Sequence, residues 1–509
     1  MRRTLGSTGF PRALRGVVFF FGFAMDCSLL SAVIRRDPSH PSVVVLVADG
    51  ARPDTLRNAL DAGALPALAR LRAEGGLHTV TTTFPSVTGP AYAPFLLGIF
   101  PGTAGLPGIR WWDRARTTGN WPHFARSYVG IQARHSDRDL TPHHRTLFEH
   151  VPDALGSLTP IGRGLTSTRR LGFGWAFAAR AAWTHFRGDL PGWLVIDREI
   201  GAMVAARIRR EQPRFALCAH PGIDKASHAV GHAHADVLAA MRIVDDTAAA
   251  IRADAVRDGR WATMHLWVVS DHGHSPVACH DDLAGLFAEW GFGVLSHPWT
   301  VGGGRDVAVM VSGNAMSHVY LELSRRARPF WRELSARWEP VASRLLDRAS
   351  VDLLVLPHSP CALEVRARAR RGRAMVRRTG DRFAYVPVDG GDPLGLGGPI
   401  EAASPEAAHA ACAGTDYPDA LVQLLQLANS SRAGEMILSA SRGWDFRGRY
   451  EPIPHVSSHG ALHREHMDVP LLLNRPVAGT PRRTTDVMPS ALAALGLPVP
   501  AGLDGVSFL

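Results

Sequence analysis

Acidic residues and histidines that could bind metal ions occur at four places in the chain. In chain order they are Asp49, Asp224 with His228, Asp271 with His272, and His459. Carboxylate oxygens and imidazole nitrogens are good ligands for zinc, with manganese or another divalent ion as alternatives. Three carboxylates and three imidazoles exceed the needs of one tetrahedral ion and suit two. Because two ions about 3.5–4 Å apart can hold the attacking and leaving oxygens of phosphoryl transfer, the set predicts a two-metal centre for phosphate chemistry.

Thr88 is the candidate nucleophile for such a centre. It lies in the turn PSVTGP, between a predicted strand and a predicted helix. Free backbone N–H groups and the dipole at the start of a helix favour a bound anion. A threonine before a helix is most often only an N-cap, so this position on its own does not identify a nucleophile.

The elements that must position these residues follow an α/β pattern. The segments 43–48 (VVVLVA), 214–220 (RFALCAH) and 265–269 (HLWVV) are apolar runs typical of strands buried on both faces. Helical patterns occupy residues 52–76 and 236–257. Alternating strands and helices predict a mostly parallel sheet, which binds ligands at the carboxyl ends of its strands. Asp49, Asp224 and Asp271 come at or just after such ends, so we expect them to converge.

The complete pattern predicts a three-layer α/β/α sandwich around a mostly parallel sheet, with an inserted cap region. Residues 1–40 would form an N-terminal leader or extension and 41–294 the first part of the catalytic core. Residues 295–430 would form the cap and 431–509 the C-terminal part of the core. Within the cap, VAVMVSGN and SHVYLEL predict strands, and the arginine-rich run 366–378 predicts a solvated loop. Aromatic residues in 174–186 predict a stripe facing the core, in preference to a surface for an apolar substrate or membrane.

The N-terminus leaves several assignments open. Four arginines precede the apolar run 17–25, as in a signal peptide, but no small-x-small cleavage site follows cleanly. The run is short for a transmembrane helix, and Met25 is an alternative start. A signal, an anchor with membrane contact, and a mis-assigned start all remain open. A cytoplasmic location is slightly favoured over a periplasmic or secreted one.

Charge and cysteine content exclude some classes of protein. The net charge is +10, yet Lys225 is the only lysine and the arginines are scattered. Scattered arginines would give only weak, salt-dependent binding to nucleic acid, so no specific nucleic acid is predicted. The five cysteines form no CxxC pair, which argues against both a cysteine zinc site and a disulfide framework.

The motifs resemble the alkaline phosphatase superfamily, and most closely its branch of nucleotide pyrophosphatases/phosphodiesterases. The resemblance covers about residues 42–112, 193–275 and 455–509 and rests on VADG, FPSVTGP, DKASH, SDHG and SSHG. It implies two divalent ions, with zinc favoured. One would be held by Asp224, His228 and His459, and the other by Asp49, Thr88, Asp271 and His272. Thr88 would attack phosphorus and form a phosphothreonine, because a bound metal lowers the pKa of the hydroxyl.

Other residues of the family pattern differ in this chain. Ala91 and Tyr92 occupy the places of an Asn-His pair, and Ile109 replaces a phosphate-binding Asn. A side-chain donor to the non-bridging phosphate oxygen is thereby lost, and the backbone N–H of Gly89 and the side chain of Arg110 are the candidate replacements. The remaining nearby histidines are interpreted as bystanders or as groups behind the ligands; they are His232, His234, His274, His463 and His466.

The first functional hypothesis is a two-metal hydrolase of phosphodiester or pyrophosphate bonds, acting on a small-molecule or lipid-linked phosphate ester. A phosphomonoesterase or a head-group phosphotransferase on the same fold is an alternative. A catalytically inactive binding protein is a second alternative, motivated by the lost donor. A sulfatase is disfavoured because position 88 is threonine and no CxPxR-type site is present. The sequence does not predict the oligomeric state.

Overall fold

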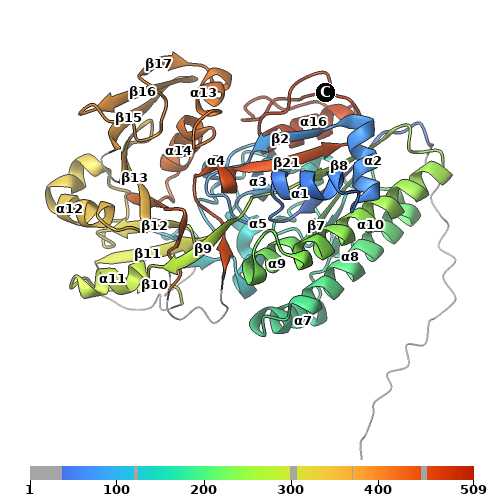
Figure 1. The fold of residues 1–509 in the computed structure, drawn as a ribbon, viewed down its shortest axis with the longest axis horizontal. Helices are drawn as coiled ribbons and strands as arrows, with labels where there is room; N and C mark the ends of the chain where they lie inside the picture. Colours follow the sequence, from blue (N-terminus) through green and yellow to red (C-terminus); the bar gives the residue numbers. More distant parts are fainter. Residues whose placement is uncertain (1–36, 120–123, 299–305, 369–370, 449–454) are drawn as a thin grey trace, which may run out of the picture.

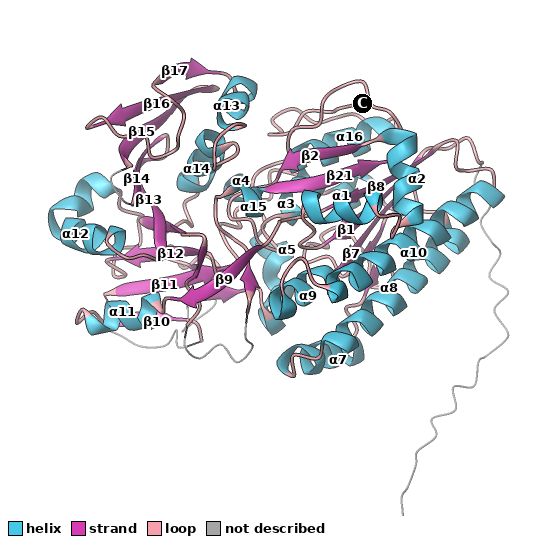
Figure 2. Cartoon of the chain, viewed as in Figure 1, coloured by secondary structure: helices cyan, strands magenta, loops and turns pink. Residues whose placement is uncertain are grey.

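A seven-stranded sheet forms the centre of the larger half of the molecule (Figures 1 and 2). The computed structural model describes residues 37–119, 124–298, 306–368, 371–448 and 455–509. In sheet order the strands are β2 (Leu77–Thr81), β21 (Asp468–Leu473), β8 (Met264–Val269), β1 (Ser42–Ala48), β7 (Phe215–His220), β5 (Leu155–Ser157) and β6 (Arg170–Leu171). The five adjacent strands from β8 to β6 are parallel, whereas β21 runs antiparallel to both of its neighbours.

Strand β1 lies at the middle of this sheet because its residues are apolar on both faces. Val43, Val45 and Val47 pack into one hydrophobic cluster, and Val44 and Leu46 pack into another on the opposite face. The first face is covered by α3 (Tyr92–Leu97), α6 (Leu147–His150) and α16 (Val487–Ala494). The second face is covered by α1 (Pro53–Asp61), α2 (Pro66–Gly75), α8 (Leu190–Glu211), α9 (Gly222–Val230) and α10 (Ala235–Arg257). The predicted three-layer sandwich is therefore confirmed.

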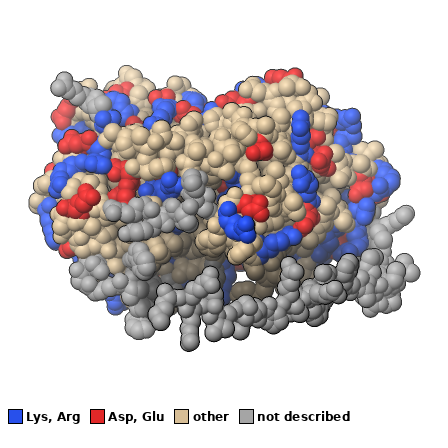
Figure 3. All heavy atoms as spheres, turned by 60° about the horizontal axis from the view of Figure 1, so that its bottom comes forward, with Lys and Arg blue, Asp and Glu red and all other residues tan. Residues whose placement is uncertain are grey.

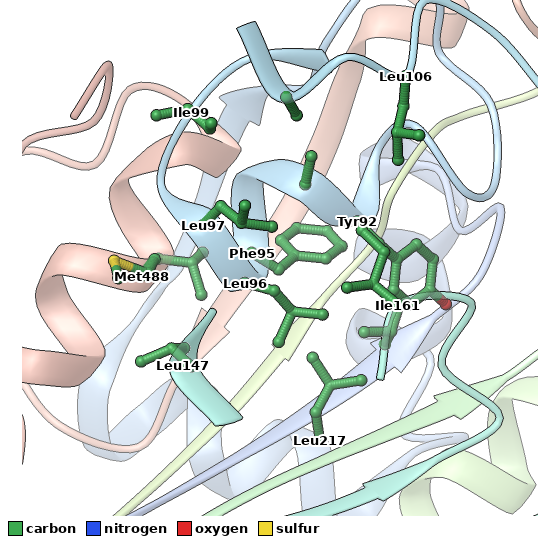
Figure 4. Close-up of a cluster of buried hydrophobic side chains, with 14 of the residues drawn as sticks. Tyr92, Phe95, Leu96, Leu97, Ile99, Leu106, Leu147, Ile161, Leu217 and Met488 are labelled. Carbon is green, nitrogen blue, oxygen red and sulfur yellow. The ribbon is translucent and has the colours of Figure 1, made fainter. Parts of the chain in front are cut away.

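The short helix α3 is held firmly against the sheet. Figure 4 shows Phe95, Leu96 and Leu97 pointing into a cluster that includes Leu217 of β7 and Met488 of α16. All six side chains of α3 are buried. The loop that precedes α3, which carries Thr88, is therefore fixed at its carboxyl end by core packing.

A second sheet, mainly antiparallel, fills the other half of the molecule (Figure 2). Its strands in order are β10 (Val294–Ser296), β11 (Val307–Ser312), β12 (Met316–Leu321), β18 (Met436–Ala440), β13 (Val351–Ser359), β14 (Ala362–Ala367), β15 (Gly372–Thr379), β16 (Arg382–Val388) and β17 (Ile400–Ala403). One face packs on α11 (Leu283–Glu289) and α12 (Trp331–Leu346), and the other on α13 (Pro405–Cys412) and α14 (Ala420–Asn429). The division of the chain into a core and a cap at residues 295 and 430 stays a prediction.

Small elements join the two halves. A three-stranded sheet consists of β19 (Gly443–Asp445), β9 (Ser275–His280) and β20 (Ser457–Ser458), and a two-stranded ribbon consists of β3 (Arg110–Trp112) and β4 (Ala125–Ser127). Three further short helices are α4 (Pro101–Ala104), α5 (Ser136–Asp139) and α15 (Arg464–Met467). Strand β9 follows the SDHG motif directly, so one ligand-bearing segment leads into this small sheet.

Two of the sequence predictions are wrong. The arginine-rich run 366–378 forms much of the β14–β15 hairpin and is not a solvated loop, because buried residues such as Ala374 and Val376 alternate with its arginines. The aromatic stripe of 174–186 does not face the core, apart from Phe177. It lies on α7 (Trp175–Phe186), where Trp175 and Phe186 are 80% and 71% exposed.

The leader assigned to residues 1–40 lies almost entirely outside the described residues, which begin at 37. Among the described residues, we find no helix that is both long and apolar enough to cross a membrane. The face drawn in Figure 3 carries its basic side chains, in blue, in small groups between acidic and uncharged side chains.

Candidate metal centre

The predicted metal-binding residues follow the carboxyl ends of three neighbouring strands. Asp49 comes directly after β1, and Asp271 and His272 come two and three residues after β8. Strand β7 ends at His220 and leads into α9, where Asp224 and His228 are four residues apart and face the same direction. The parallel pairing of β8, β1 and β7 brings these segments to one edge of the sheet, as predicted.

The first group of ligand atoms surrounds Thr88. Its Oγ1 lies 3.3 Å from Oδ1 of Asp49 and 3.1 Å from Nε2 of His272. Nε2 of His272 in turn lies 3.3 Å from Oδ1 of Asp49 and 3.7 Å from Oδ2 of Asp271. Asp49, Asp271 and His272 form one of two buried groups with the geometry to hold a metal ion. Thr88 lies four residues before α3, so it is not inside the helix or at its first turn.

The second group is centred on Asp224. Its Oδ1 lies 3.2 Å from Nε2 of His228 and 3.6 Å from Nε2 of His459. The other oxygen, Oδ2, accepts a hydrogen bond of 2.8 Å from Nζ of Lys225, the only lysine of the chain. His459 follows β20, so the small sheet delivers it to the centre. The buried group that could hold an ion here comprises Asp224, His272, His274 and His459.

The histidine rings are oriented by their outer nitrogens. Nδ1 of His228 lies 2.8 Å from the carbonyl oxygen of Ser457, and Nδ1 of His459 lies 2.9 Å from that of Ser86. Nδ1 of His272 lies 3.1 Å from the carbonyl oxygen of Gly273. Carbonyl oxygens only accept, so each Nδ1 must donate, and a neutral ring then presents the lone pair of Nε2 to the carboxylates. Metal-binding histidines are typically held in this way.

The electrostatics of the site favour bound cations. The carboxylates of Asp49, Asp224 and Asp271 are at least 95% buried, and each has an oxygen within 4.0 Å of Nε2 of His272. Burial, reinforced by Asp49, raises the pKa of Asp271 to about 8. Burial opposes a charge on His272, but Asp271 and Asp49 outweigh it and raise the pKa of His272 to about 9. Oδ2 of Asp271 has no hydrogen-bond partner among the described residues. Positive ions would relieve the repulsion between these carboxylates, so the residues fit a two-metal centre.

Sequence reasoning left His274 outside the ligand set, as a bystander or a group behind the ligands. Its Nε2 lies 2.9 Å from Oδ1 of Asp224, inside the second group. The sequence signal that could have indicated this contact was the position of His274, two residues after His272 in a segment that follows a strand end. The role of Lys225 was also missed, since a single lysine beside a carboxylate is common on helices.

The two predicted phosphate-binding groups differ in how the structure supports them. Gly89 follows Thr88 with φ of +101°, and no described residue accepts a hydrogen bond from its backbone N–H. Arg110 begins β3, and its backbone contacts Oγ of Ser312. Both assignments stay predictions.

The sandwich fold and the two buried acid–histidine groups are those of an alkaline phosphatase-like protein with a candidate two-metal site. Residues 43–329 match the sequence profile described as type I phosphodiesterase/nucleotide pyrophosphatase. The chain therefore belongs to this family of the alkaline phosphatase superfamily, and it is a family enzyme with a candidate metal site. A comparison with curated protein sequences gave no match.

Solved structures support the same fold. Phosphonoacetate hydrolase from Sinorhizobium meliloti 1021, in complex with phosphonoformate, has a TM-score of 0.54 at 16% identity, over 90% of this chain and 96% of that one. Human ectonucleotide pyrophosphatase/phosphodiesterase 5 has a TM-score of 0.54 at 12% identity, over 91% of this chain and 97% of its own. An inactive variant of the murine protein, in complex with AMP, has a TM-score of 0.50 at 12% identity, covering 91% and 96%.

Proposed function

We propose that this enzyme hydrolyses phosphodiester or pyrophosphate bonds through a phosphothreonine on Thr88. The observation that carries the proposal is the position of the Thr88 hydroxyl, within 3.5 Å of both Asp49 and His272 at the carboxyl edge of the sheet. A threonine hydroxyl is a weak nucleophile at neutral pH unless its environment favours the alkoxide. The proposed ligands of one ion are Asp224, His228 and His459, and those of the other are Asp49, Thr88, Asp271 and His272.

The two divalent ions, with zinc favoured, would neutralise the carboxylates, lower the pKa of the threonine hydroxyl and stabilise charge on the phosphate oxygens. Oγ1 of Thr88 forms a bond to phosphorus while the bond from phosphorus to the leaving oxygen breaks. Water then attacks the phosphothreonine, which releases the second product and restores the hydroxyl. The N–H of Gly89 would donate to a non-bridging oxygen, and Arg110 is the second candidate donor.

The proposed substrate is a small phosphate ester. The AMP bound to the murine relative and the phosphonate bound to the bacterial hydrolase support a pocket for a compact phosphorus-containing group. A diester or pyrophosphate is favoured by the family to which the chain belongs.

The test compares hydrolysis of bis-p-nitrophenyl phosphate and p-nitrophenyl phosphate by zinc-loaded protein. Thr88→Ala should abolish turnover of the diester, whereas Thr88→Ser should retain part of it because the hydroxyl is kept. Thr79→Ala, on the exposed side of β2, is the matched control and should leave turnover unchanged. Full activity of Thr88→Ala would refute the nucleophile. Preference for the monoester would favour the phosphatase alternative.

A second candidate is a hydrolase or phosphotransferase for lipid-linked phosphate esters, and helix α7 favours it. Its outer face carries Trp175, Trp183 and Phe186 at helical spacing, all at least 65% exposed. Phe177 and Ala181 face inward and pack on the core. Arg187 stacks on Trp183 with 5.3 Å between guanidinium carbon and ring centre, and α7 contains no acidic residue. An aromatic face flanked by arginine is typical of helices that bind anionic membrane surfaces.

This helix lies close to the proposed centre. His185 of α7 contacts Trp193, with 6.5 Å between ring centres, and Nζ of Lys225 lies 5.8 Å from the same indole. Lys225 pairs directly with Asp224. A lipid-linked phosphate could therefore reach the centre from a membrane in contact with α7. Sedimentation with phosphatidylglycerol vesicles tests this candidate: the triple variant of Trp175, Trp183 and Phe186 to alanine should lose binding. Failure of the wild-type protein to bind would exclude the candidate.

A further inference from the structure

We infer that His274 is a further ligand of the ion held by Asp224, His228 and His459, which gives that ion one carboxylate and three imidazoles. The inference rests on the proposed two-metal centre and extends it to a residue outside the predicted ligand set. His274 is completely buried, and its ring occupies a space that Gly50 leaves open. A Cβ at position 50 would lie 3.0 Å from this ring, and Gly50 has a φ of +78°.

A chain of hydrogen bonds fixes which nitrogen of His274 carries the proton. The hydroxyl of Ser457 donates to the carbonyl oxygen of Ser275 at 2.9 Å, so its single hydrogen is used. Nδ1 of His274 lies 3.2 Å from the same hydroxyl oxygen and must therefore donate to it. A neutral imidazole has only one N–H, so Nε2 of His274 presents a lone pair.

That lone pair points at a carboxylate. Nε2 of His274 lies 2.9 Å from Oδ1 of Asp224, and an ionised carboxylate oxygen has only lone pairs. Two acceptors at this distance repel one another unless a cation lies between them. The same oxygen lies 3.2 Å from Nε2 of His228 and 3.6 Å from Nε2 of His459, which face it in the same way.

These separations agree with shared coordination. With Zn–N and Zn–O bonds of about 2.0–2.1 Å, neighbouring ligand atoms of a tetrahedral site lie about 3.3 Å apart. The three nitrogen distances to Oδ1 of Asp224, 2.9, 3.2 and 3.6 Å, bracket that value, and the ligand atoms of Asp224, His274 and His459 belong, with that of His272, to one buried group that could hold an ion. The competing arrangement, in which Nε2 of His274 donates to Asp224, would turn the Ser457 hydroxyl away from Ser275. The carbonyl oxygen of Ser275 would then face another lone pair at 2.9 Å.

The inference makes the two sites unequal. The ion at Asp224 would be held by four residues that do not react, whereas the ligands of the other ion include Thr88, which reacts during turnover. The ion at Asp224 should therefore be the more resistant to chelators.

The test measures zinc affinity and counts imidazole ligands. The Asp271→Asn protein, in which the Thr88 site is disabled, is loaded with one zinc ion and studied by X-ray absorption. Three imidazoles per zinc are expected, and two would overturn the inference without any change at position 274. The glutamine side chain of His274→Gln can donate a hydrogen bond to Asp224, but it does not supply the imidazole nitrogen that would bind the ion. It should weaken the site by more than about 100-fold, beyond the usual effect of losing a supporting hydrogen bond.

The controls separate this inference from the proposed function. His232→Gln, at a half-buried histidine outside the cluster, should retain wild-type zinc affinity. If His274→Gln binds zinc within tenfold of the wild type, His274 is only a donor to Asp224 and the inference fails, while the two-metal centre stands. If the wild-type protein does not bind two zinc ions, the proposed function itself fails.

Discussion

Asp197 offers a test of how burial controls a charge close to the proposed centre. It lies on α8 with no exposed surface, and its Oδ2 accepts a 2.8 Å hydrogen bond from the backbone N–H of Gly222 at the start of α9. Oδ1 has no hydrogen-bond partner among the described residues. Burial raises the pKa of Asp197 from its ordinary 3.8 to about 8, against the opposing effect of the Gly222 hydrogen bond. Replacement by asparagine keeps the acceptor for Gly222 and removes the titration.

The sign and size of the effect follow from the two pKa values. Because the folded-state pKa lies above the unfolded one, Asp197 contributes stability below pH 3.8 that is lost as the pH rises through about 8. Over most of that range the contribution of Asp197 to the free energy of unfolding falls by about 1.4 kcal/mol per pH unit. Between pH 5 and pH 8 it sums to about 3–4 kcal/mol. Asp197→Asn should therefore gain this amount relative to the wild type over the same interval.

Urea unfolding of the wild type and Asp197→Asn at pH 5, 6, 7 and 8 measures the difference directly. All other titrating groups are shared by the two proteins, so their contributions cancel. Asp189→Asn, at the exposed N-cap of the same helix, is the control and should give a difference independent of pH. If the difference between wild type and Asp197→Asn also stays constant to within about 0.5 kcal/mol, Asp197 is ionised throughout the range and the reasoning is refuted.

Three further predictions concern the metal ions and the buried polar groups. Removal of metal by a chelator should lower the melting temperature, because the buried carboxylates would lose their counter-charges; an unchanged calorimetric transition would contradict this. Glu435→Ala should lower the free energy of unfolding by about 3–5 kcal/mol, since it leaves the buried guanidinium of Arg114 (2.7 Å away) unpaired, whereas the exposed Glu199→Ala should cost less than about 1 kcal/mol. The Cβ added by Gly222→Ala would lie 2.3 Å from a carboxylate oxygen of α8, so this variant should bind zinc more weakly in a zinc titration. The Cβ added by Gly414→Ala meets nothing within 4 Å, so this variant should bind zinc as the wild type does.

The sheet and its ligand-bearing edge were predictable from sequence for a clear physical reason. Strands buried on both faces are continuous apolar runs, and each of the runs before Asp49, Asp224 and Asp271 formed a strand of the central sheet. Parallel pairing then leaves little choice about where the following residues meet. His459 was found through its motif, since β20 is too short to leave a strand pattern.

The errors arise where local pattern and tertiary packing disagree. The amphipathic spacing of α7 was clear, but spacing alone cannot tell which of two apolar faces is covered. Phe177 and Ala181 lie on the inner face of α7, whereas its two tryptophans lie on the outer face. The arginines of β14 and β15 were mistaken for a loop because their charge concealed a period of two. The contacts of His274 could not be predicted from the sequence, because one of them is to Ser457, which is 183 residues away.

The second sheet is more than a cover for the centre, because it fixes one of the proposed ligands. Asn314, in the turn between β11 and β12, forms a β-bridge with His459, and the N–H of Ala315 donates to the carbonyl oxygen of His459 at 3.1 Å. On its other side, β20 pairs with β9, which continues from the segment that carries Asp271 and His272. His459 is therefore held between the two halves of the molecule. Any change that shifts the β11–β12 turn should move one ligand relative to the others, and so alter metal affinity from outside the catalytic sheet.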